Sequence, residues 1–202
     1  MSKANLHKPA SGSRELLTDH KKLVRLLLLV CIVLSNISSQ ALASDPPQEY
    51  QVKAAMTYKF LGYSEWPPTQ FDGPHSPYRI WVLDSTATKN ELQRIVAHRI
   101  INGRSIEVYS ATTVNQIDNA HIVFVARDME FLLPRLSRRA RKNAYLVVTE
   151  NEHGLVEGST INLRLVNGRV GFDISLNSAQ SCGITLSSSL LSIAVSIEEG
   201  QR

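Results

Sequence analysis

The sequence predicts an α/β fold, a single three-layer sandwich with a mixed, mostly parallel sheet and a C-terminal β-hairpin plus helix. Short apolar runs alternate with segments of helical spacing, a pattern typical of parallel strands that are covered on both faces. Further along, Asn167-Gly168 separates two strand-like segments and is the strongest short-range hairpin signal. The apolar runs are residues 78–83, 105–109, 122–125 and 145–149.

The elements of the first half follow from caps and prolines. A first helix is predicted to begin at Asp45, which can cap it, with Pro46 in the first helical position. It ends before the prolines at 67–68, because a residue that precedes proline is pushed out of the helical region. A second helix is expected over residues 90–101, and the turn 102–104 leads into the second strand.

In the second half, the predicted helix 129–142 turns Leu132, Leu133, Leu136 and Ala140 inward, and Pro134 falls in its first turn. The hairpin strands are predicted over 160–166 and 169–175, with the hairpin as the antiparallel edge of the sheet. A short helix follows at 178–182. The last helix is expected over about 185–197, because apolar residues recur there on one stripe.

The N-terminal segment is typical of a signal peptide over residues 1–43. Lys21, Lys22 and Arg25 precede an apolar run that is shorter than the about 20 residues of a membrane span. Ala41-x-Ala43 then fits a small-x-small cleavage site. We therefore expect cleavage after Ala43, export to the periplasm and a single domain over 44–202; the alternative is an uncleaved anchor.

The charge balance argues against a nucleic-acid-binding protein. Residues 1–43 contain six Lys/Arg and two Asp/Glu, whereas the rest of the chain contains 16 of each. The formal charge of +4 therefore belongs to the predicted targeting segment and not to the predicted domain.

Recognisable catalytic patterns do not occur in the sequence. Residues 84–87 (Asp-Ser-Thr-Ala) follow the first strand, where a dinucleotide-binding protein would have a glycine-rich turn. Cys182, the one cysteine after residue 43, is predicted to be a buried structural thiol, with a nucleophile as the alternative. Glu150 and Glu152 lie at a strand end where solvated acids are common, and Asp173 could face them across the sheet. We expect no enzyme activity and no cofactor.

The histidines after residue 43 do not have metal-ligand spacing, and they are predicted to be ordinary hydrogen-bonded residues. They are His75, His98, His121 and His153.

Two features could bind a partner. A basic cluster at the end of the predicted helix 129–142 has two readings: a solvated face that suits the helix C-terminus, or a contact with an acidic partner or a membrane surface. The second feature is the crevice expected where parallel strands end, near Asp84, Arg127 and Glu150. The basic cluster consists of Arg135, Arg138, Arg139, Arg141 and Lys142.

An ordered set of segments resembles the YfiR family of periplasmic proteins. Residues 50–67 (YQVKAAMTYKFLGYSEWP) resemble its first helix, which is rich in alanine and aromatic residues and ends in Trp-Pro. Residues 121–125 (HIVFV) and 145–150 (YLVVTE) resemble two of its strands, and residues 168–177 (GRVGFDISLN) resemble its hairpin. The resemblance covers nearly all of the chain after residue 43.

The resemblance implies a non-enzymatic regulator. Such a protein binds the periplasmic region of a membrane-bound diguanylate cyclase and represses it, which lowers cyclic-di-GMP signalling and affects biofilm formation. An outer-membrane lipoprotein can relieve the repression, and a homodimer is compatible with the family. Better-known members contain paired cysteines, so the single Cys182 argues against redox control by an intrachain disulfide here.

Two other functions remain open from the residues alone. One is a small-ligand-binding periplasmic component that feeds a sensor histidine kinase, using the crevice at the strand ends. The other is a hydrolase that uses a serine or Cys182 as nucleophile.

Overall fold

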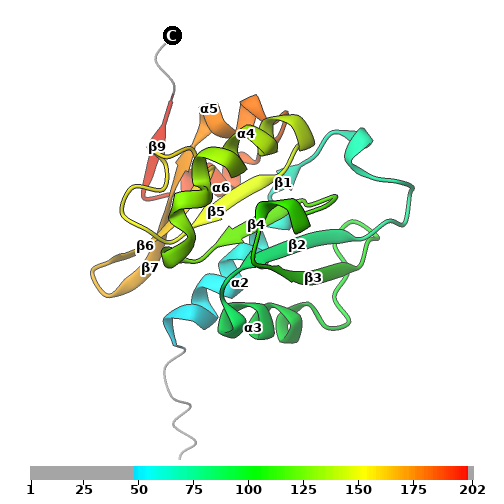
Figure 1. Cartoon of the computed structure of the whole chain (residues 1–202), viewed down its shortest axis with the longest axis horizontal. Helices are drawn as coiled ribbons and strands as arrows, with labels where there is room; N and C mark the ends of the chain where they lie inside the picture. The colour runs from blue at the N-terminus through cyan, green and yellow to red at the C-terminus, as the bar shows by residue number, and fades with distance from the viewer. Residues whose placement is uncertain (1–47, 200–202) are drawn as a thin grey trace, which may run out of the picture. The chain divides into compact units, whose positions relative to one another are not determined.

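The computed structural model describes residues 48–199, which form a seven-stranded mixed sheet with helices on both faces (Figure 1). The strand order is β3-β2-β4-β5-β6-β7-β9. The α/β sandwich that the sequence predicts is therefore confirmed. The strands are β2 (Tyr78–Leu83), β3 (Ile106–Ala111), β4 (Ile122–Val125), β5 (Leu146–Thr149), β6 (Ile161–Val166), β7 (Arg169–Ser175) and β9 (Ser196–Glu198).

The centre of the sheet is parallel and apolar on both faces. β2 pairs in parallel with β3 on one side and with β4 on the other, and β5 pairs in parallel with β4. Ile80, Ile122 and Leu146 lie side by side across these strands and are fully buried. All four runs identified in the sequence are thus strands, and those of β4 and β5 are buried throughout, as continuous apolar runs in a sheet covered on both faces should be.

The helices divide between the two faces because of the direction of the crossovers. The chain passes from β2 to β3 through α3 (Thr86–Val96), and from β4 to β5, in the opposite direction along the sheet, through α4 (Leu133–Asn143). Right-handed crossovers in opposite directions place the two helices on opposite faces. The first helix, α2 (Glu49–Gly62), packs beside α3.

Two helices begin elsewhere than the sequence indicated. For α2, Gln48 is the N-cap and forms a capping box with Gln51; the predicted cap Asp45 and Pro46 lie outside the described residues. α3 starts at Thr86 rather than at 90, because the Ser85 side chain accepts a hydrogen bond from the Thr88 N–H at 3.3 Å and caps the helix there.

The helix predicted over 129–142 is divided into two elements. A 3₁₀ helix, η3 (Arg127–Leu132), leads directly into α4. Pro134 lies in the first turn of α4, where its missing N–H costs nothing, whereas it could not continue a longer α-helix through this point. Two further 3₁₀ turns are η1 (Pro68–Gln70) and η2 (Val114–Gln116).

The hairpin is confirmed, but it is not the edge of the sheet. Asn167 and Gly168 have φ of 51° and 76°, the left-handed values that a two-residue turn requires, and β6 pairs antiparallel with β7. β9 then adds to the outside of β7 in parallel.

The prediction of a last helix over residues 185–197 is wrong. α5 (Leu176–Ser181) is followed by β8 (Thr185–Leu186), which pairs with β1 (Ser64–Glu65), by the short helix α6 (Ser188–Ser192) and by β9. Ser187 caps α6 by accepting a hydrogen bond from the Leu190 N–H at 3.2 Å. Of the predicted stripe, Ile193 is 65% exposed, because the backbone leaves the helix there and residues 196–198 pair with β7 instead.

No helix within residues 48–199 is long and apolar enough to cross a membrane. The signal peptide predicted over 1–43 lies outside the described residues.

Candidate functional site

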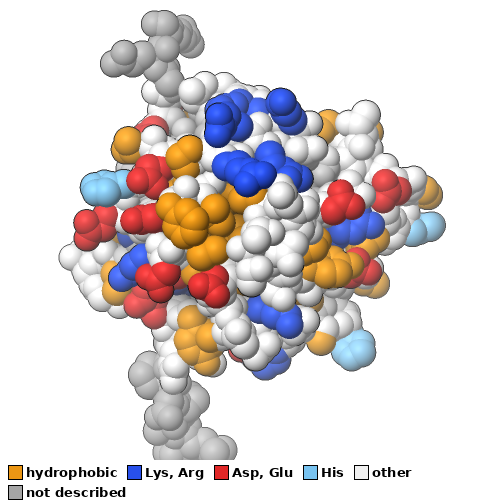
Figure 2. Space-filling model, in the orientation of Figure 1, with side chains coloured by type: hydrophobic (Ala, Val, Ile, Leu, Met, Phe, Trp, Pro, Cys, Tyr) orange, Lys and Arg blue, Asp and Glu red, His pale blue; other side chains and the backbone are white. Residues whose placement is uncertain are grey.

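The helix α4 carries the basic cluster on a face directed away from the sheet. Leu133, Leu136 and Ala140 are at most 1% exposed and pack on the sheet, as the helical spacing predicted. The basic residues fall on the remaining positions of the helix. Figure 2 shows Lys and Arg side chains gathered over α4, with hydrophobic side chains beside them.

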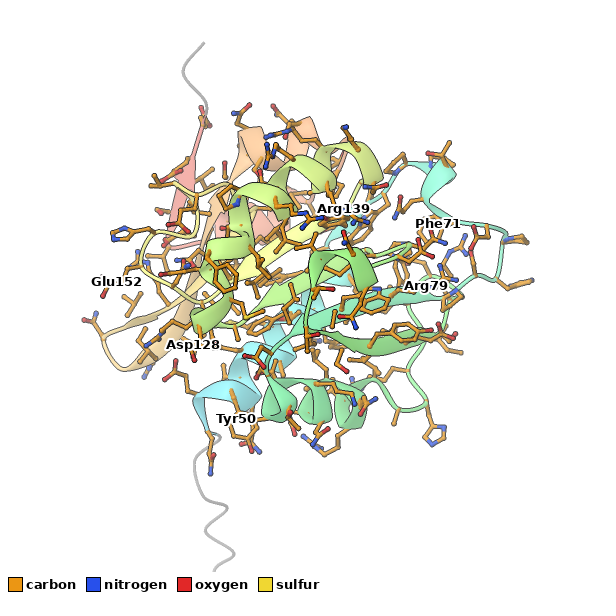
Figure 3. The ribbon with its side chains drawn as sticks, in the orientation of Figure 1. Tyr50, Phe71, Arg79, Asp128, Arg139 and Glu152 are labelled. Atoms are coloured by element: carbon orange, nitrogen blue, oxygen red, sulfur yellow. The ribbon has the colours of Figure 1, made fainter. Side chains whose placement is uncertain are left out.

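One member of the cluster differs from the others. The guanidinium of Arg139 donates hydrogen bonds to the carbonyl oxygens of Val114 and Ile117, at 3.0 and 3.1 Å (Figure 3). These carbonyls belong to the connection that runs from β3 to β4, so Arg139 ties α4 to this connection. The Arg139 guanidinium therefore stabilises the fold, and we do not count it among the groups that could bind a partner.

The other four residues of the cluster are exposed: Arg135, Arg138, Arg141 and Lys142. Arg135 donates to the Asn115 side chain at 2.7 Å, and Arg138 to the Pro134 carbonyl oxygen at 3.2 Å. Within residues 48–199, none of the four pairs with a carboxylate. The exposed side of α4 therefore presents to solvent positive charge that no carboxylate of the described residues compensates.

An exposed aromatic ring precedes the basic cluster in the chain. Phe131 lies in η3, directly before α4, and its side chain is 69% exposed. Exposed aromatic and arginine side chains are enriched in the centres of protein interfaces. The surface formed by the four exposed basic residues Arg135, Arg138, Arg141 and Lys142 is called the α4 face below.

A cavity of about 740 Å³ lies where strands of the sheet end. Arg127 and Glu150, two of the three residues that the sequence placed at a crevice, line it; Asp84 does not. Figure 3 shows Glu152 on the side of the molecule that carries the hairpin. The other lining residues come from α2, η3, the loop after β5 and the hairpin strands: Glu49, Lys53, Glu130, Asn151, Glu152, His153, Asn162, Leu163, Arg164, Leu165 and Asp173.

Most charges of the cavity are paired with one another. Lys53 is 3% exposed and its ammonium contacts the carboxylates of Glu49 and Glu150, the latter at 2.5 Å. Arg164 holds Asp173 with two hydrogen bonds from its guanidinium. Arg127, Glu130 and Glu152, by contrast, make no ion pair among the described residues, and Glu130 accepts a hydrogen bond from the Asn151 side chain. Arg127 and Glu152 thus leave a positive and a negative charge for a ligand.

The Lys53 pair could not be identified from the sequence. Lys53 and Glu150 are 97 positions apart, and a lysine in a helix is ordinarily exposed. Only the i,i+4 spacing of Glu49 and Lys53 gave a local signal, and that spacing is common on solvated helix faces.

Most of the residues considered as catalytic candidates are either buried or held in ion pairs. Cys182 is 4% exposed, and burial raises the pKa of its thiol, which disfavours the reactive thiolate. Its predicted burial is therefore confirmed. Glu150 is held by Lys53 and Asp173 by Arg164, while Glu152 is exposed to solvent.

His121 is fully buried, and its prediction as a hydrogen-bonded histidine is confirmed for one ring nitrogen only, since its Nε2 has no hydrogen-bond partner among the described residues. Its Nδ1 accepts a hydrogen bond from the Arg79 N–H at 3.1 Å, and its ring is surrounded by those of Trp66, Phe71 and Tyr78. Within residues 48–199, no three His, Cys, Asp or Glu side chains gather as metal ligands would.

These surfaces define an α/β domain that offers a charged cavity and a basic helix face to other molecules. The chain belongs to the YfiR/HmsC-like family, because the family model (DUF4154, YfiR/HmsC-like) matches residues 50–195. This family is one of periplasmic regulators associated with diguanylate cyclase signalling, the class that the resemblance implied. No curated protein sequence matches the chain.

Two solved structures align with the chain at low sequence identity. A conserved domain protein from Vibrio cholerae O1 biovar eltor aligns with a TM-score of 0.50 and 10% identity, over 74% of this chain and 60% of that one. The ABC domain in complex with L-Trp from Streptococcus pneumonia aligns with a TM-score of 0.49 and 12% identity, over 72% and 60%. The chain thus covers 60% of the length of both, and the first alignment shows a shared fold alone.

Proposed function

We propose that this protein is a periplasmic repressor of a membrane-bound diguanylate cyclase, and that it acts by binding the periplasmic region of the cyclase. The family match over residues 50–195 supports this class of function. The observation that supports binding to the cyclase is the α4 face. Its four exposed basic side chains lack carboxylate partners in the described part of the chain.

Repression by binding requires a difference in affinity between two states of the receptor. A protein that binds the inactive state more tightly shifts the equilibrium toward that state by this difference and by no more. In this proposal an acidic region of the cyclase contacts the α4 face in the inactive state. Cyclic-di-GMP then falls although this protein never touches the nucleotide, and an outer-membrane lipoprotein that competes for the protein relieves the repression.

The α4 face is tested by charge reversal. Arg138→Glu with Arg141→Glu is expected to weaken binding to the cyclase's periplasmic region at least tenfold, about 1.4 kcal/mol, because reversed charges would face the same acidic partner. Binding is measured by titration calorimetry at two salt concentrations, and added salt should weaken the wild-type complex.

The matched control reverses two exposed basic residues elsewhere. Lys59→Glu with Arg169→Glu changes the net charge equally, but these residues lie on α2 and β7. This control should bind as the wild type does. If both double variants bind equally well, the α4 face is not the contact surface; if the wild type does not bind the cyclase at all, the proposed function is wrong.

The cavity supports a second candidate, a small-ligand-binding component that feeds a sensor histidine kinase. The observation that favours it is a cavity of about 740 Å³ at strand ends, the size and place typical of ligand pockets. Arg127 and Glu152 together suit a ligand that carries both an anionic and a cationic group.

A thermal-shift screen of small zwitterions, acids and amines tests the second candidate. A ligand should raise the midpoint of unfolding of the wild type, and Arg127→Ala should abolish that shift while leaving the unliganded midpoint unchanged, since Arg127 is exposed. A stabilising ligand whose effect survives Arg127→Ala would contradict this use of the cavity.

A further inference from the structure

Two aromatic rings stack at the edge of the sheet that β3 forms. Trp81 of β2 and Tyr109 of β3 are register partners, and their ring centres lie 4.9 Å apart with planes inclined by 23°. The indole N–H of Trp81 donates to the Asp118 carbonyl oxygen at 3.0 Å, which fixes this ring. Because β3 turns Ile106 and Val108 toward α3, the stacked rings lie on the opposite face of the sheet.

The outer face of the Tyr109 ring is free. β3 is the last strand of the described sheet, and within residues 48–199 no further ring, arginine or lysine lies over Tyr109. Its side chain is 38% exposed. The Tyr109 hydroxyl donates to the Glu107 carboxylate at 2.6 Å, and the Glu107 side chain is 45% exposed. A bare ring face and a carboxylate thus lie side by side at this edge.

The charges around the stacked rings are negative on balance. The Arg79 guanidinium lies 3.8 Å from Glu107 and 3.5 Å from Asp72, so one cation is shared between two carboxylates. Asp118, next to Trp81, is exposed and makes no ion pair in the described part of the chain. Three carboxylates against one guanidinium favour a positively charged group beside the Tyr109 ring.

The backbone of β3 is also available at this edge. β3 pairs in parallel with β2 along all six of its residues and has no second strand partner within residues 48–199 (Figure 1). The Ser105 carbonyl accepts a hydrogen bond from the Tyr78 N–H, so Ser105 points toward β2. By alternation, the backbone groups of Ile106, Val108 and Ser110 point outward.

A groove of about 780 Å³ follows the edge on its α3 side. Its walls are β3 and the end of α3 with residues 97–100, and Val96 and Ile106, 7% and 8% exposed, form an apolar floor. The edge therefore offers apolar contacts on one face and an aromatic ring with a carboxylate on the other. A strand that pairs with this edge should alternate in the same way.

We propose that β3 binds an extended segment of a partner protein in which an arginine alternates with apolar residues. The segment pairs antiparallel with the free edge and extends the sheet by one strand. Its arginine lies opposite Tyr109, and the residues on either side of the arginine point into the groove. The backbone groups of Tyr109 point toward β2, so this pair is a non-hydrogen-bonded one, in which side chains lie closest.

Arginine suits this position because of its shape as well as its charge. Its planar guanidinium stacks on an aromatic face and pairs with a carboxylate at the same time. On the outer face of Tyr109 it becomes the third member of the stack that Trp81 begins, and Glu107 lies beside it. A lysine has no planar group to stack, and an acidic residue would meet like charges.

A synthetic peptide tests the site on the full chain, purified as its host processes it. The probe is fluorescein-labelled Thr-Val-Arg-Val-Thr-Val, whose valines alternate with its arginine as the groove requires. Fluorescence polarisation should show saturable binding at micromolar protein concentration. Replacing the arginine by citrulline, which keeps the planar group but not the charge, should weaken binding about fivefold, and glutamate should weaken it further.

Matched substitutions in the protein separate the ring from the rest of the surface. Tyr109→Ala removes the stacking face and should weaken binding of the arginine peptide about fivefold. Tyr63→Ala, at a tyrosine that is 40% exposed at the end of α2, should bind as the wild type does. Glu107→Gln should reduce the preference for arginine over citrulline. Val108→Pro removes an outward N–H and should abolish binding, with circular dichroism as in the wild type.

A wild type that does not bind the arginine peptide would overturn the proposal, as would equal binding by Tyr109→Ala or equal affinity for the glutamate peptide. Light scattering during the titration tests a competing occupant. If the peptide splits a dimer of this chain, a second copy holds the edge and the proposal fails. The proposal does not depend on the cyclase, and these results leave the α4 face untouched.

Discussion

The ring of His121 is enclosed by Trp66, Phe71 and Tyr78, with ring-centre distances of 4.8 to 5.5 Å. Burial, and then the charges of Arg79 and Arg104, lower the pKa of His121 to about 4 from its ordinary value of 6.5. The neutral ring is therefore the form that the native structure accommodates.

This pKa shift predicts acid-sensitive stability. Between pH 6.5 and about 4 the unfolded chain binds a proton at His121 and the native protein does not, so the free energy of unfolding falls as the pH falls through this range. The loss amounts to about 3 kcal/mol when the full shift is expressed. About 2 kcal/mol of this loss falls between pH 7 and pH 5, and urea unfolding at these two pH values measures it.

The control for this prediction is a neutral side chain. His121→Gln keeps an acceptor for the Arg79 N–H and should flatten the dependence of unfolding on pH over this range. His75→Gln, at an exposed histidine, should leave the dependence as in the wild type. Equal pH dependence of the His121→Gln variant and the wild type would show that another group is responsible.

Lys53 is a second buried polar residue, and here the stability depends on the carboxylates that it contacts. Removing one member of a buried pair is more damaging than replacing the pair, because an uncompensated charge remains. Glu150→Gln should thus lower the free energy of unfolding by about 1–3 kcal/mol, since Lys53, 3% exposed, keeps only Glu49. Lys53→Met with Glu150→Met, which replaces both members of the pair, should cost less in the same urea titration; a larger loss for this double variant would contradict this account.

At the scale of elements, α4 combines a structural arginine with solvent-exposed ones. Arg139→Ala removes the bonds to the Val114 and Ile117 carbonyls and should destabilise the protein by about 1–3 kcal/mol. Arg138→Ala, one position earlier and exposed, should change stability by less than about 0.5 kcal/mol. Thermal unfolding of the two variants separates these roles, and equal midpoints would refute them.

The elements also show where sequence reasoning works. The runs that became β2, β4 and β5 were identified correctly, because central strands that are covered on both faces are mostly apolar. The turn at Asn167-Gly168 was equally clear, because few residues adopt its positive φ values. Both signals are local, and few alternative structures are compatible with either of them.

The errors lie where local signals were weak. Residues 185–197 show a helical stripe, yet residues 196–198 form β9 because β7 offers a free edge with which they pair. For α3, the Ser85 cap is present in the sequence, but the predicted helix begins only at residue 90 and does not include it. Pairing with a distant strand therefore determined the structure of residues 196–198. The start of α3, by contrast, was predictable from the Ser85 cap alone.

At the scale of the whole molecule, the predicted export requires processing at residue 43. The mass of the protein isolated from the periplasm should correspond to a chain that begins at Ser44. Ala43→Leu, which replaces the small residue at the cleavage site, should keep the longer mass and remain with the membrane. An unprocessed wild type in the cytosol would contradict periplasmic function.

The candidate site was only partly accessible from the sequence. The basic cluster was visible as a run of arginines, and the crevice followed from the ends of parallel strands near Arg127 and Glu150. The different role of Arg139, by contrast, depends on carbonyl groups more than 20 positions away. The open edge of β3 depends on which strand ended up outermost in the sheet.

The sequence by itself determined the fold class, the central strands, the hairpin and the resemblance to the family, because these follow from apolar periodicity and turn residues along the chain. Only the tertiary structure decided the pairing of Lys53 with Glu150, the place of β9 and the division of α4's arginines into structural and free. These features depend on which distant segments meet, and the free energy of burial and pairing between them overrides local preference.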